Sequence, residues 1–472
     1  MARSIITIDD LSIDDMEHIF DLADGFLEVM HDPARPHRIQ GRDDLANRFI
    51  LSTLFFEPST RTRFSFESAM HRLGGQVLSS PNSAATSAAK GESIADTVRV
   101  LENYADLIVI RHPSEGAARV AANFASVPVI NAGDGSHEHP TQTLCDLYTL
   151  RREKKSFKDL MVVLYGDLRH GRTVHSLVYA LARLDARIIP MPAKGLELPD
   201  HVVRRLQRDY GCTPIKMEEK SHGRGLPIDV IYVTQEKPHQ RRLYPEAELA
   251  EFNASLKKLL AKIDNIDVFY VTRLQKERLG EPRGTEKYPP IDNAFLKGKQ
   301  YKDSRVLHPL PRVAELGYDL DRDPRGVYFK QAAYGVPVRM ALIAWLLDLK
   351  PSNKPTTLVR EFPQYGHKDG IRCVNQACVT NLPSEQDHLT PAFWIVEEDG
   401  PVILRCMFCE YEWAVSCVGR VSKRRYHTAA SKWRCIPADD LIMFAEERDA
   451  TNAEFTPYKE TNTGKCLAPA SS

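Results

Sequence analysis

The chain contains 472 residues, too many for one hydrophobic core, and this length predicts about three domains. Lysine plus arginine number 63, as do aspartate plus glutamate, so the charge balance gives no basic footprint for nucleic acid or a membrane surface. Hydrophobic residues make up 43% and charged residues 27% of the chain, the composition of a soluble globular protein.

The sequence shows no pattern of a targeting or membrane-spanning segment. Asp9 and Asp10 stand where a secretory signal would have positive charge. The longest apolar stretch, residues 340–349, has about half the length that a bilayer demands. We therefore expect a cytoplasmic protein, in which the nine cysteines are metal ligands and reduced thiols rather than disulfides.

Residues 1–150 alternate between extended and helical patterns, and residues 151–330 do so again. This alternation predicts two α/β domains with mostly parallel sheets flanked by helices. The predicted strands are 48–55, 106–110, 127–131, 160–165 and 268–272, and the predicted helices are 64–73 and 331–349, the last of which closes the second unit.

Three further segments follow the two α/β domains. Residues 350–372 are rich in proline and glycine in a polar context, which predicts a linker. Residues 373–449 contain short extended runs and predict a small β-rich domain. Residues 450–472 are polar without periodicity and predict a disordered tail.

An anion-binding pattern, Ser-Thr-Arg-Thr-Arg, stands at residues 59–63. It precedes a helix whose apolar positions Phe66, Met70 and Leu73 recur at helical spacing. Hydroxyl and backbone N–H groups at a helix N-terminus bind anions, and Arg61 adds a bidentate guanidinium for a phosphorylated substrate. In isolation, such a segment is as often a plain N-cap with solvated arginines.

Three later segments add ligand groups. Ser87 and Lys90 lie in a loop of small residues before a helical pattern. Arg111 directly follows a buried strand, where α/β sheets present ligand groups. His139 stands at a loop-to-helix junction and can donate to a carbonyl oxygen, although alone it would more often be a structural cap.

Two arginines in the second α/β domain predict an anionic substrate. Arg172 opens a helix after one strand, and Arg273 follows another. Two guanidinium groups match a dicarboxylate. The segment 229–235 nearly repeats 267–273, which two strands of similar composition would explain.

Four cysteines form two close pairs, Cys373 with Cys378 (C-x4-C) and Cys406 with Cys409 (C-x2-C). This spacing predicts one structural zinc ion in a closed tetrahedral thiolate site, with no metal needed for catalysis. Two disulfides are the alternative, which a cytoplasmic location disfavours.

Seven motifs in chain order make residues 1 to about 350 resemble aspartate carbamoyltransferase. The motifs are S-T-R-T-R at 59–63, S-x-x-K-G-E-S at 87–93, R-H-P at 111–113, H-P-T-Q at 139–142, G-D-L-x-x-G-R-T-V-H-S at 166–176, T-R-x-Q-K-E-R at 272–278 and H-P-L-P-R at 308–312. The resemblance implies transfer of a carbamoyl group from carbamoyl phosphate to L-aspartate in pyrimidine (UMP) biosynthesis. It also implies a homotrimer with shared active sites.

The resemblance further implies roles for single residues. Carbamoyl phosphate would be bound by Ser59, Thr60, Arg61, Thr62, Ser87, Arg111, His139, Gln142, Leu310 and Pro311, and aspartate by Lys90, Arg172, Arg273 and Gln275. Thr62, Arg111 and His139 would stabilise the oxyanion, and Arg61 and Lys90 would neutralise the departing phosphate. Ser87 and Lys90 would reach into a neighbouring subunit's site.

Two alternatives stay open. Ornithine carbamoyltransferases share the phosphate-binding half, but they have cysteine within H-C-L-P and an S-M-G motif, whereas position 309 here is proline and Arg273 is present. The acceptor should therefore be acidic rather than basic. A non-catalytic scaffold would have no use for Arg61, Arg111 and His139 together.

The segment from Cys373 resembles the zinc domain of the aspartate carbamoyltransferase regulatory chain. A nucleotide-binding domain precedes it in that chain, and the linker of about twenty residues here is too short for one. We expect this domain to steady the enzyme or to join trimers into a larger assembly, without sensing nucleotides. Residues 216–257 exceed the family's usual connection and predict a surface elaboration.

Overall fold

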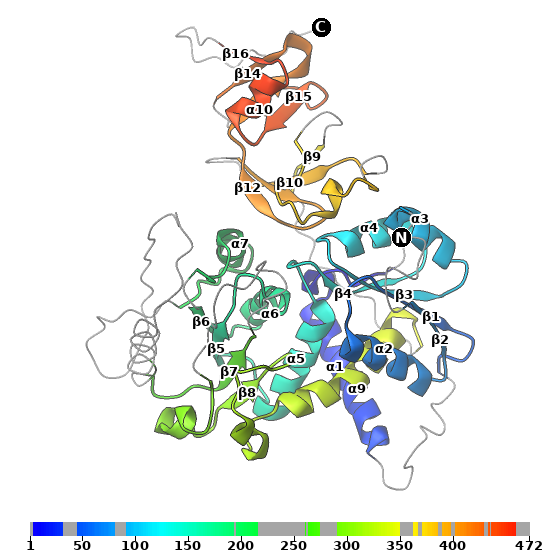
Figure 1. Cartoon of the computed structure of the whole chain (residues 1–472), viewed down its shortest axis with the longest axis vertical. Helices are drawn as coiled ribbons and strands as arrows, with labels where there is room; N and C mark the ends of the chain where they lie inside the picture. Colours follow the sequence, from blue (N-terminus) through cyan, green and yellow to red (C-terminus); the bar gives the residue numbers. More distant parts are fainter. Residues whose placement is uncertain are drawn as a thin grey trace.

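The computed structural model describes residues 3–31, 45–80, 91–192, 195–215, 260, 263–273, 290–349, 362–366, 371–385, 389–397, 402–428, 433–434 and 436–458. They form two α/β domains side by side and a β-rich unit above them (Figure 1). The predicted fold class, two parallel-sheet domains and a small C-terminal β-rich domain, is confirmed. Within these ranges, none of the helices combines the length and apolarity needed to cross a bilayer.

The first domain contains a four-stranded parallel sheet in the order β2-β1-β3-β4. Its strands are β1 (Ile50–Phe55), β2 (Gln76–Ser80), β3 (Leu107–His112) and β4 (Val129–Asp134), and its helices are α1 (Ile13–Met30), α2 (Thr60–Arg72), α3 (Ile94–Leu101), α4 (Ala117–Phe124) and α5 (Pro140–Lys154). Strands β3 and β4 are buried almost throughout, because helices cover both faces of a parallel sheet. The helix predicted at 64–73 begins earlier, at Thr60, because its polar first turn has no apolar periodicity.

The second domain repeats this architecture with the strand order β6-β5-β7-β8. Its strands are β5 (Met161–Gly166), β6 (Arg187–Pro192), β7 (Val268–Val271) and β8 (Arg305–Leu307), and its helices are α6 (Arg172–Arg183) and α7 (Asp200–Tyr210). Short 3-10 helices occur at Ile8–Asp10, Phe295–Lys297, Lys299–Tyr301, Tyr318–Arg322, Val379–Asn381 and Val421–Lys423. The predicted elaboration at 216–257 and the near-repeat at 229–235 lie outside the described residues.

The last helix of the catalytic unit, α9 (Tyr328–Leu346), packs against α1, α2 and α5 of the first domain. The prediction that it closes the second unit is therefore wrong. Its residues 340–345 are buried on every side, and such a helix must be enclosed by other elements. Helices α1, α5 and α9 consequently lie between the two sheets (Figure 1), and one hydrophobic core cluster extends from the first sheet to the second.

The C-terminal unit contains two small sheets. Strands β9 (Gln364–Gly366), β10 (Ala392–Glu397), β11 (Ile403–Cys406) and β12 (Glu412–Ala414) form an antiparallel sheet in the order β12-β11-β10-β9. Strands β13 (Cys417–Arg420), β14 (Arg425–His427), β15 (Leu441–Phe444) and β16 (Thr456–Pro457) form the second in the order β15-β13-β14-β16, beside helix α10 (Glu447–Asn452).

Two boundary predictions are wrong. Residues 364–366, assigned to the linker, form β9, where Tyr365 is buried and stacks on Phe393. Residues 450–458, assigned to the disordered tail, include the end of α10 and strand β16, and Phe455 is buried there. Elements of two or three ordered residues are too short to show a periodic pattern, so sequence composition alone misassigned them.

Charged side chains join the C-terminal unit to both α/β domains. Arg205 of α7, only 4% exposed, pairs with Glu410 of the C-terminal unit and with Asp9, whose Oδ2 lies 2.7 Å from its Nη2. His137 lies between Asp134 at 3.1 Å and Glu410 at 3.5 Å. This buried cluster therefore contains groups from all three units.

A second set of contacts also joins the C-terminal unit to the two α/β domains. Arg208 Nη2 lies 2.7 Å from Glu412, and Arg405 Nη2 lies 2.5 Å from Asp209. On the first domain, the Glu115 N–H donates to the Ala377 carbonyl at 2.8 Å. Because these contacts include backbone bonds as well as ion pairs, the C-terminal unit is fixed against both domains rather than tethered beside them.

Because Arg205 is buried, its replacement should measurably lower the stability of the protein. Arg205→Met would leave Glu410 buried without its main cation and lower the free energy of unfolding by about 3 kcal/mol. Arg187→Met is the matched control, because the side chains of the Arg187–Asp159 pair are 50% and 64% exposed, and it should cost at most about 0.5 kcal/mol. Urea unfolding followed by circular dichroism measures both, and equal losses would contradict the prediction.

Candidate active site

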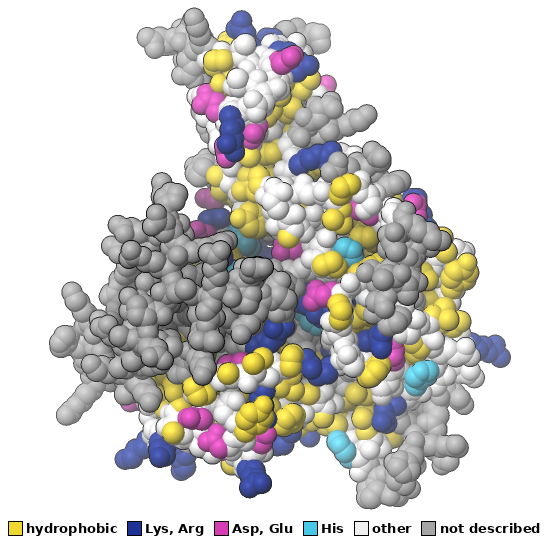
Figure 2. All heavy atoms as spheres, in the orientation of Figure 1, with side chains coloured by type: hydrophobic (Ala, Val, Ile, Leu, Met, Phe, Trp, Pro, Cys, Tyr) yellow, Lys and Arg dark blue, Asp and Glu magenta, His cyan; other side chains and the backbone are white. Residues whose placement is uncertain are grey.

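A cavity of about 1200 Å³ opens between the two α/β domains. Its walls come from the segments that follow β1, β3, β5, β7 and β8, all at the carboxyl ends of parallel strands, and from α9. Open α/β sheets bind ligands at this edge. Figure 2 shows Lys or Arg side chains and histidines near the centre of the molecule, and the cavity lining includes Arg111, Arg172 and His139.

The structure brings together the residues that the sequence assigned to the two substrates, where they are described. Those that line the cavity are Ser59, Thr60, Arg61, Thr62, Arg111, His139, Gln142, Arg172, Arg273, Leu310 and Pro311. Ser87, Lys90 and Gln275 lie outside the described residues.

The N-terminus of α2 lines the cavity. Ser59 is the N-cap, and its Oγ lies 3.1 Å from Thr62 Oγ1. The first backbone N–H groups of a helix have no partner within the helix, so together with two hydroxyls they suit a phosphate group. Arg61 lies in the same turn, and burial followed by the charge of Arg273 lowers the pKa of its guanidinium.

Glu57 was missed by the sequence analysis, although it directly precedes the Pro58-Ser59 segment. Its carboxylate lies 2.8 Å from Arg111 Nη2 and 2.7 Å from Arg172 Nη2. Arg111 belongs to the first domain and Arg172 to the second, so this carboxylate holds two cations from two domains at the cavity wall. An acidic residue at the end of β1, beside a cationic pattern, was the only local signal for it.

Gly133 permits this arrangement of arginines. A Cβ atom at that position would lie 3.1 Å from Arg172 Nε and 3.2 Å from Arg111 Nη1, and the backbone has a φ of +112°. Both the space and the backbone conformation therefore favour glycine. Arg111 Nη1 also donates to the Ala132 carbonyl at 3.1 Å, and Arg172 Nη1 donates to the Gly135 carbonyl at 2.9 Å.

His139 is the N-cap of α5 and is 3% exposed. Its backbone N–H donates to Ser176 Oγ at 2.8 Å, which ties the loop before α5 to α6 of the second domain. Burial lowers the pKa of the His139 imidazole well below its usual value, and the charges of Arg111, Arg172 and Arg339 add to this effect. The side chain is therefore a neutral imidazole, which donates through one ring nitrogen and accepts through the other.

A buried histidine fixes the loop that contains Leu310 and Pro311. His308 Nε2 lies 2.9 Å from Glu315 Oε1, and the Leu310 N–H donates to His308 Nδ1 at 2.8 Å. Burial opposes ionisation of Glu315, but the hydrogen bonds from His308 and the backbone lower its pKa to about 2. An ionised Glu315 only accepts, so His308 has its proton on Nε2 and presents Nδ1 as the acceptor.

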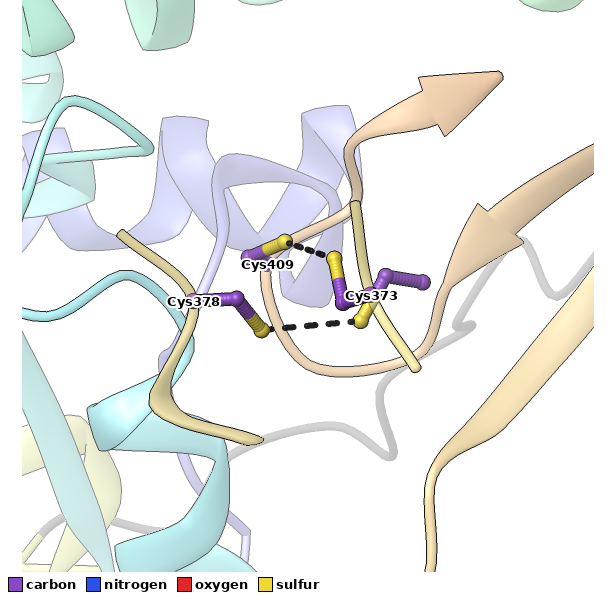
Figure 3. Close-up of side chains that lie close together, drawn as sticks. Cys373, Cys378 and Cys409 are labelled. Atoms are coloured by element: carbon purple, nitrogen blue, oxygen red, sulfur yellow. Dashed lines mark hydrogen bonds between the residues drawn. The ribbon is translucent and has the colours of Figure 1, made fainter. Parts of the chain in front are cut away.

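The four predicted metal ligands meet in one buried cluster. Cys373, Cys378, Cys406 and Cys409 are at most 3% exposed, and their sulfur atoms all lie within 4.8 Å of one another. Figure 3 shows the Cys373, Cys378 and Cys409 sulfurs turned inward from neighbouring loops. The neighbouring Ala377 lines the cavity, so the loop between Cys373 and Cys378 forms part of the cavity wall.

The neutral state of His139 predicts how stability depends on pH. The unfolded chain binds a proton at this histidine near pH 6.5 and the folded chain does not, so the folded state loses stability as the pH falls. Between pH 7.5 and 5.5, His139 should contribute about 1.4 kcal/mol to the loss of stability of the wild type. His139→Gln should lack this contribution, so its stability should fall less over the same pH range. Urea unfolding at both pH values measures it, and identical pH slopes would contradict the prediction.

Comparison with known proteins follows the same division of the chain. Residues 3–152 match the family described as aspartate/ornithine carbamoyltransferase, carbamoyl-P binding domain, and residues 236–346 match the corresponding Asp/Orn binding domain. Residues 368–416 match the metal binding domain of the aspartate carbamoyltransferase regulatory chain. The sheet from β13 to β16 lies beyond this last match.

Curated relatives include the aspartate carbamoyltransferase catalytic subunits of Thermoplasma acidophilum, 42% identical over 350 residues, and Methanocaldococcus jannaschii, 40% identical over 349 residues. Each alignment covers 73% of this chain and 98% of the relative.

Solved structures agree with these relatives. The catalytic subunit of M. jannaschii aspartate transcarbamoylase is 39% identical with a TM-score of 0.57, covering 73% of this chain and 98% of that one. Aspartate transcarbamoylase from Trypanosoma cruzi, in complex with N-(phosphonacetyl)-L-aspartic acid, is 32% identical with a TM-score of 0.57, covering 72% and 94%. The chain is therefore a carbamoyl-transferring enzyme that belongs to the aspartate/ornithine carbamoyltransferase family, with a regulatory-chain type of metal-binding domain at its C-terminal side.

Proposed function

We propose that the cavity binds carbamoyl phosphate and L-aspartate and transfers the carbamoyl group to the aspartate amine, giving N-carbamoyl-L-aspartate and phosphate. The observation that supports this most is one cavity that is lined both by a helix N-terminus and by two arginines of the second domain, Arg172 and Arg273. A T. cruzi relative has been solved with carbamoyl phosphate and aspartate bound.

The first domain would bind the phosphorylated substrate. Ser59, Thr60 and Thr62 offer hydroxyl and backbone donors at the start of α2, and Arg61 supplies the positive charge. Ser87 would contribute a further donor. Gln142, Leu310 and Pro311 would surround the carbamoyl end of the molecule.

The second domain would bind the acceptor. Arg172 begins α6, after β5, and Arg273 follows β7, and both line the cavity, so their guanidinium groups would bind the carboxylates of the acceptor. Lys90 and Gln275 would complete this half. A cationic wall of this kind selects an acidic amino acid over ornithine, whose extra ammonium group would be repelled.

The chemistry needs no covalent nucleophile. The neutral aspartate amine attacks the carbonyl carbon, a C–N bond forms, the C–O bond to phosphate breaks, and one amine proton leaves with the phosphate. Thr62, Arg111 and the neutral His139 would donate to the oxygen that becomes negative, an effect of about 3 kcal/mol per donor. Arg61 and Lys90 would neutralise the departing phosphate.

The choice of acceptor tests this function. Purified protein should carbamoylate L-aspartate and leave L-ornithine unreacted, and Arg273→Ala should lower kcat/KM for aspartate by about 100-fold, because one charge-assisted pair is lost. Arg187→Ala is the control and should keep wild-type kinetics, because Arg187 is an exposed residue at the start of β6. Arg61→Ala separates an enzyme from a scaffold, since only an enzyme loses turnover. Turnover of ornithine but not aspartate would reject the proposal.

We also propose that the metal of the C-terminal unit is zinc, bound by Cys373, Cys378, Cys406 and Cys409. Tetrahedral Zn²⁺ with Zn–S bonds of about 2.3 Å requires sulfurs roughly 3.8 Å apart. The Cys373–Cys409 and Cys378–Cys406 distances are 3.5 and 3.9 Å, which fits this geometry. When bound, the ion would cross-link two loops of a unit with a small hydrophobic core, and would leave no position for catalytic water.

Metal analysis tests this site. The reduced, folded chain should contain one equivalent of zinc, and Cys409→Ser should lose the metal and lower the temperature at which the C-terminal unit unfolds. Cys212→Ser, at a half-buried cysteine outside the cluster, should retain the metal. Less than about half an equivalent in the wild type, measured under reducing conditions, would reject zinc binding.

We further propose a cytoplasmic homotrimer that acts in de novo pyrimidine (UMP) biosynthesis, with Ser87 and Lys90 reaching a neighbouring site. In support of assembly, the described part of the first domain exposes large apolar side chains, including Tyr104 at 56% and Leu78 at 44%, the latter on β2, which is the outermost strand in the described order of its sheet. Contacts through the C-terminal unit would account for any assembly larger than a trimer.

A further inference from the structure

Asp146 is a buried carboxyl that lies behind the cavity rather than in its wall. It belongs to α5, is 0% exposed, and accepts three hydrogen bonds from three different elements. Gln142 Nε2 and Gln331 Nε2 donate to its Oδ1 at 2.8 and 2.6 Å, and the Tyr270 hydroxyl donates to its Oδ2 at 2.9 Å. The mechanism described above gives this residue no role.

A carboxylate only accepts hydrogen bonds, so it determines which way each amide faces. Gln142 directs its NH₂ group to Asp146 and therefore turns its Oε1 atom away from the carboxylate. Gln142 also lines the cavity. The glutamine is thus held as a hydrogen-bond acceptor toward bound substrate instead of a donor.

The side-chain amide of Gln331 connects Asp146 to the loop that contains Leu310. Gln331 gives its NH₂ group to Asp146, and its Oε1 accepts from the His308 backbone N–H at 2.9 Å. His308 Nδ1 in turn accepts from the Leu310 N–H. Each of these donors is therefore used inside the protein. Because Pro309 and Pro311 have no N–H, the backbone of residues 308–311 can meet the substrate only through its carbonyl oxygens.

We propose that Asp146 is a positioning residue that makes the cavity specific for the NH₂ group of the carbamoyl donor. It orients Gln142 and, through Gln331 and His308, the Leu310 backbone as acceptors for two N–H bonds. An acyl group with NH₂ satisfies these acceptors, whereas an acyl group of the same shape with a methyl leaves them buried and unpaired. This inference rests on the proposed function, since it concerns the donor substrate of that reaction.

Acetyl phosphate is the matched probe, because it has a methyl group where carbamoyl phosphate has NH₂. With it, the aspartate amine would form a C–N bond to the acetyl carbon, the C–O bond to phosphate would break, and N-acetyl-L-aspartate and phosphate would form. The measured quantity is kcat/KM for carbamoyl phosphate divided by kcat/KM for acetyl phosphate. Burial raises the pKa of Asp146 to about 7, so assays at pH 8.5 keep the carboxyl ionised.

Asp146→Asn keeps the shape of the side chain but introduces an NH₂ donor. The amide of Gln142 or of Gln331 can then rotate and present its oxygen to Asn instead of its NH₂ group. We expect the ratio to fall by about tenfold, the factor that one lost hydrogen bond of ordinary strength represents. A residue that only supports the fold would lower both kcat/KM values together and leave the ratio unchanged. An unchanged ratio in Asp146→Asn therefore overturns the inference.

Two further variants complete the experiment. Tyr148→Phe is the control, because the Tyr148 hydroxyl donates to Asp24 at 2.7 Å on another face of α5, and its ratio should equal that of the wild type. If Asp146→Asn does not fold, Tyr270→Phe removes one donor to Asp146, and a fall of about threefold supports the inference while no fall overturns it. A wild-type chain that does not carbamoylate aspartate would reject the proposed function itself, which separates the two failures.

Discussion

The arrangement of the catalytic site depends on the ion pairs of the Glu57 carboxylate with Arg111 of the first domain and Arg172 of the second. Parallel strands of both domains end at the same cavity, and these ends place several arginines around one space. Cations so close together repel in a partly buried site unless a counter-charge lies among them. Glu57 supplies that charge within 2.8 Å of both guanidinium groups, and in doing so it connects the first domain to the second. A substrate anion would enter a cavity whose cations are already held in place.

Behind the cavity, a second carboxylate, which is buried, also forms bonds to elements of both domains. Helices α5 and α9 lie between the sheets, and their polar residues face a small buried network instead of solvent. Asp146 on α5, Gln331 on α9 and Tyr270 on β7 meet there, so one carboxylate bonds to elements of both domains. Buried polar groups of this kind are costly unless every partner is satisfied, and a satisfied network fixes one arrangement of side chains. Rigid orientation of the cavity wall follows from that requirement.

The C-terminal unit is part of the same body. Glu410 follows directly on Cys409 of the four-cysteine cluster and pairs with Arg205 of the second domain, while the loop between Cys373 and Cys378 bonds to Glu115 of the first. Ala377 of that loop reaches the cavity wall. Phe408 approaches the Gly116 backbone so closely that a Cβ atom there would lie 2.7 Å away. The cysteine loops are thus in direct contact with the loop between β3 and α4 of the first domain.

Local patterns in the sequence were enough to predict the two α/β domains, the helix that begins within residues 59–63, the arginines that follow strands of the second domain and the cysteine pairs, because periodicity, capping and ligand spacing involve residues close together in the chain. The partners of Glu57, Asp146 and Arg205, in contrast, became visible only in the folded structure. Glu57 and Arg172 are separated by 115 residues, and Arg205 and Glu410 by 205. The folded structure also showed that α9 packs on the first domain, and that β9 and β16 are strands. Pairings across such distances depend on how whole elements pack, and no local pattern of side chains specifies them.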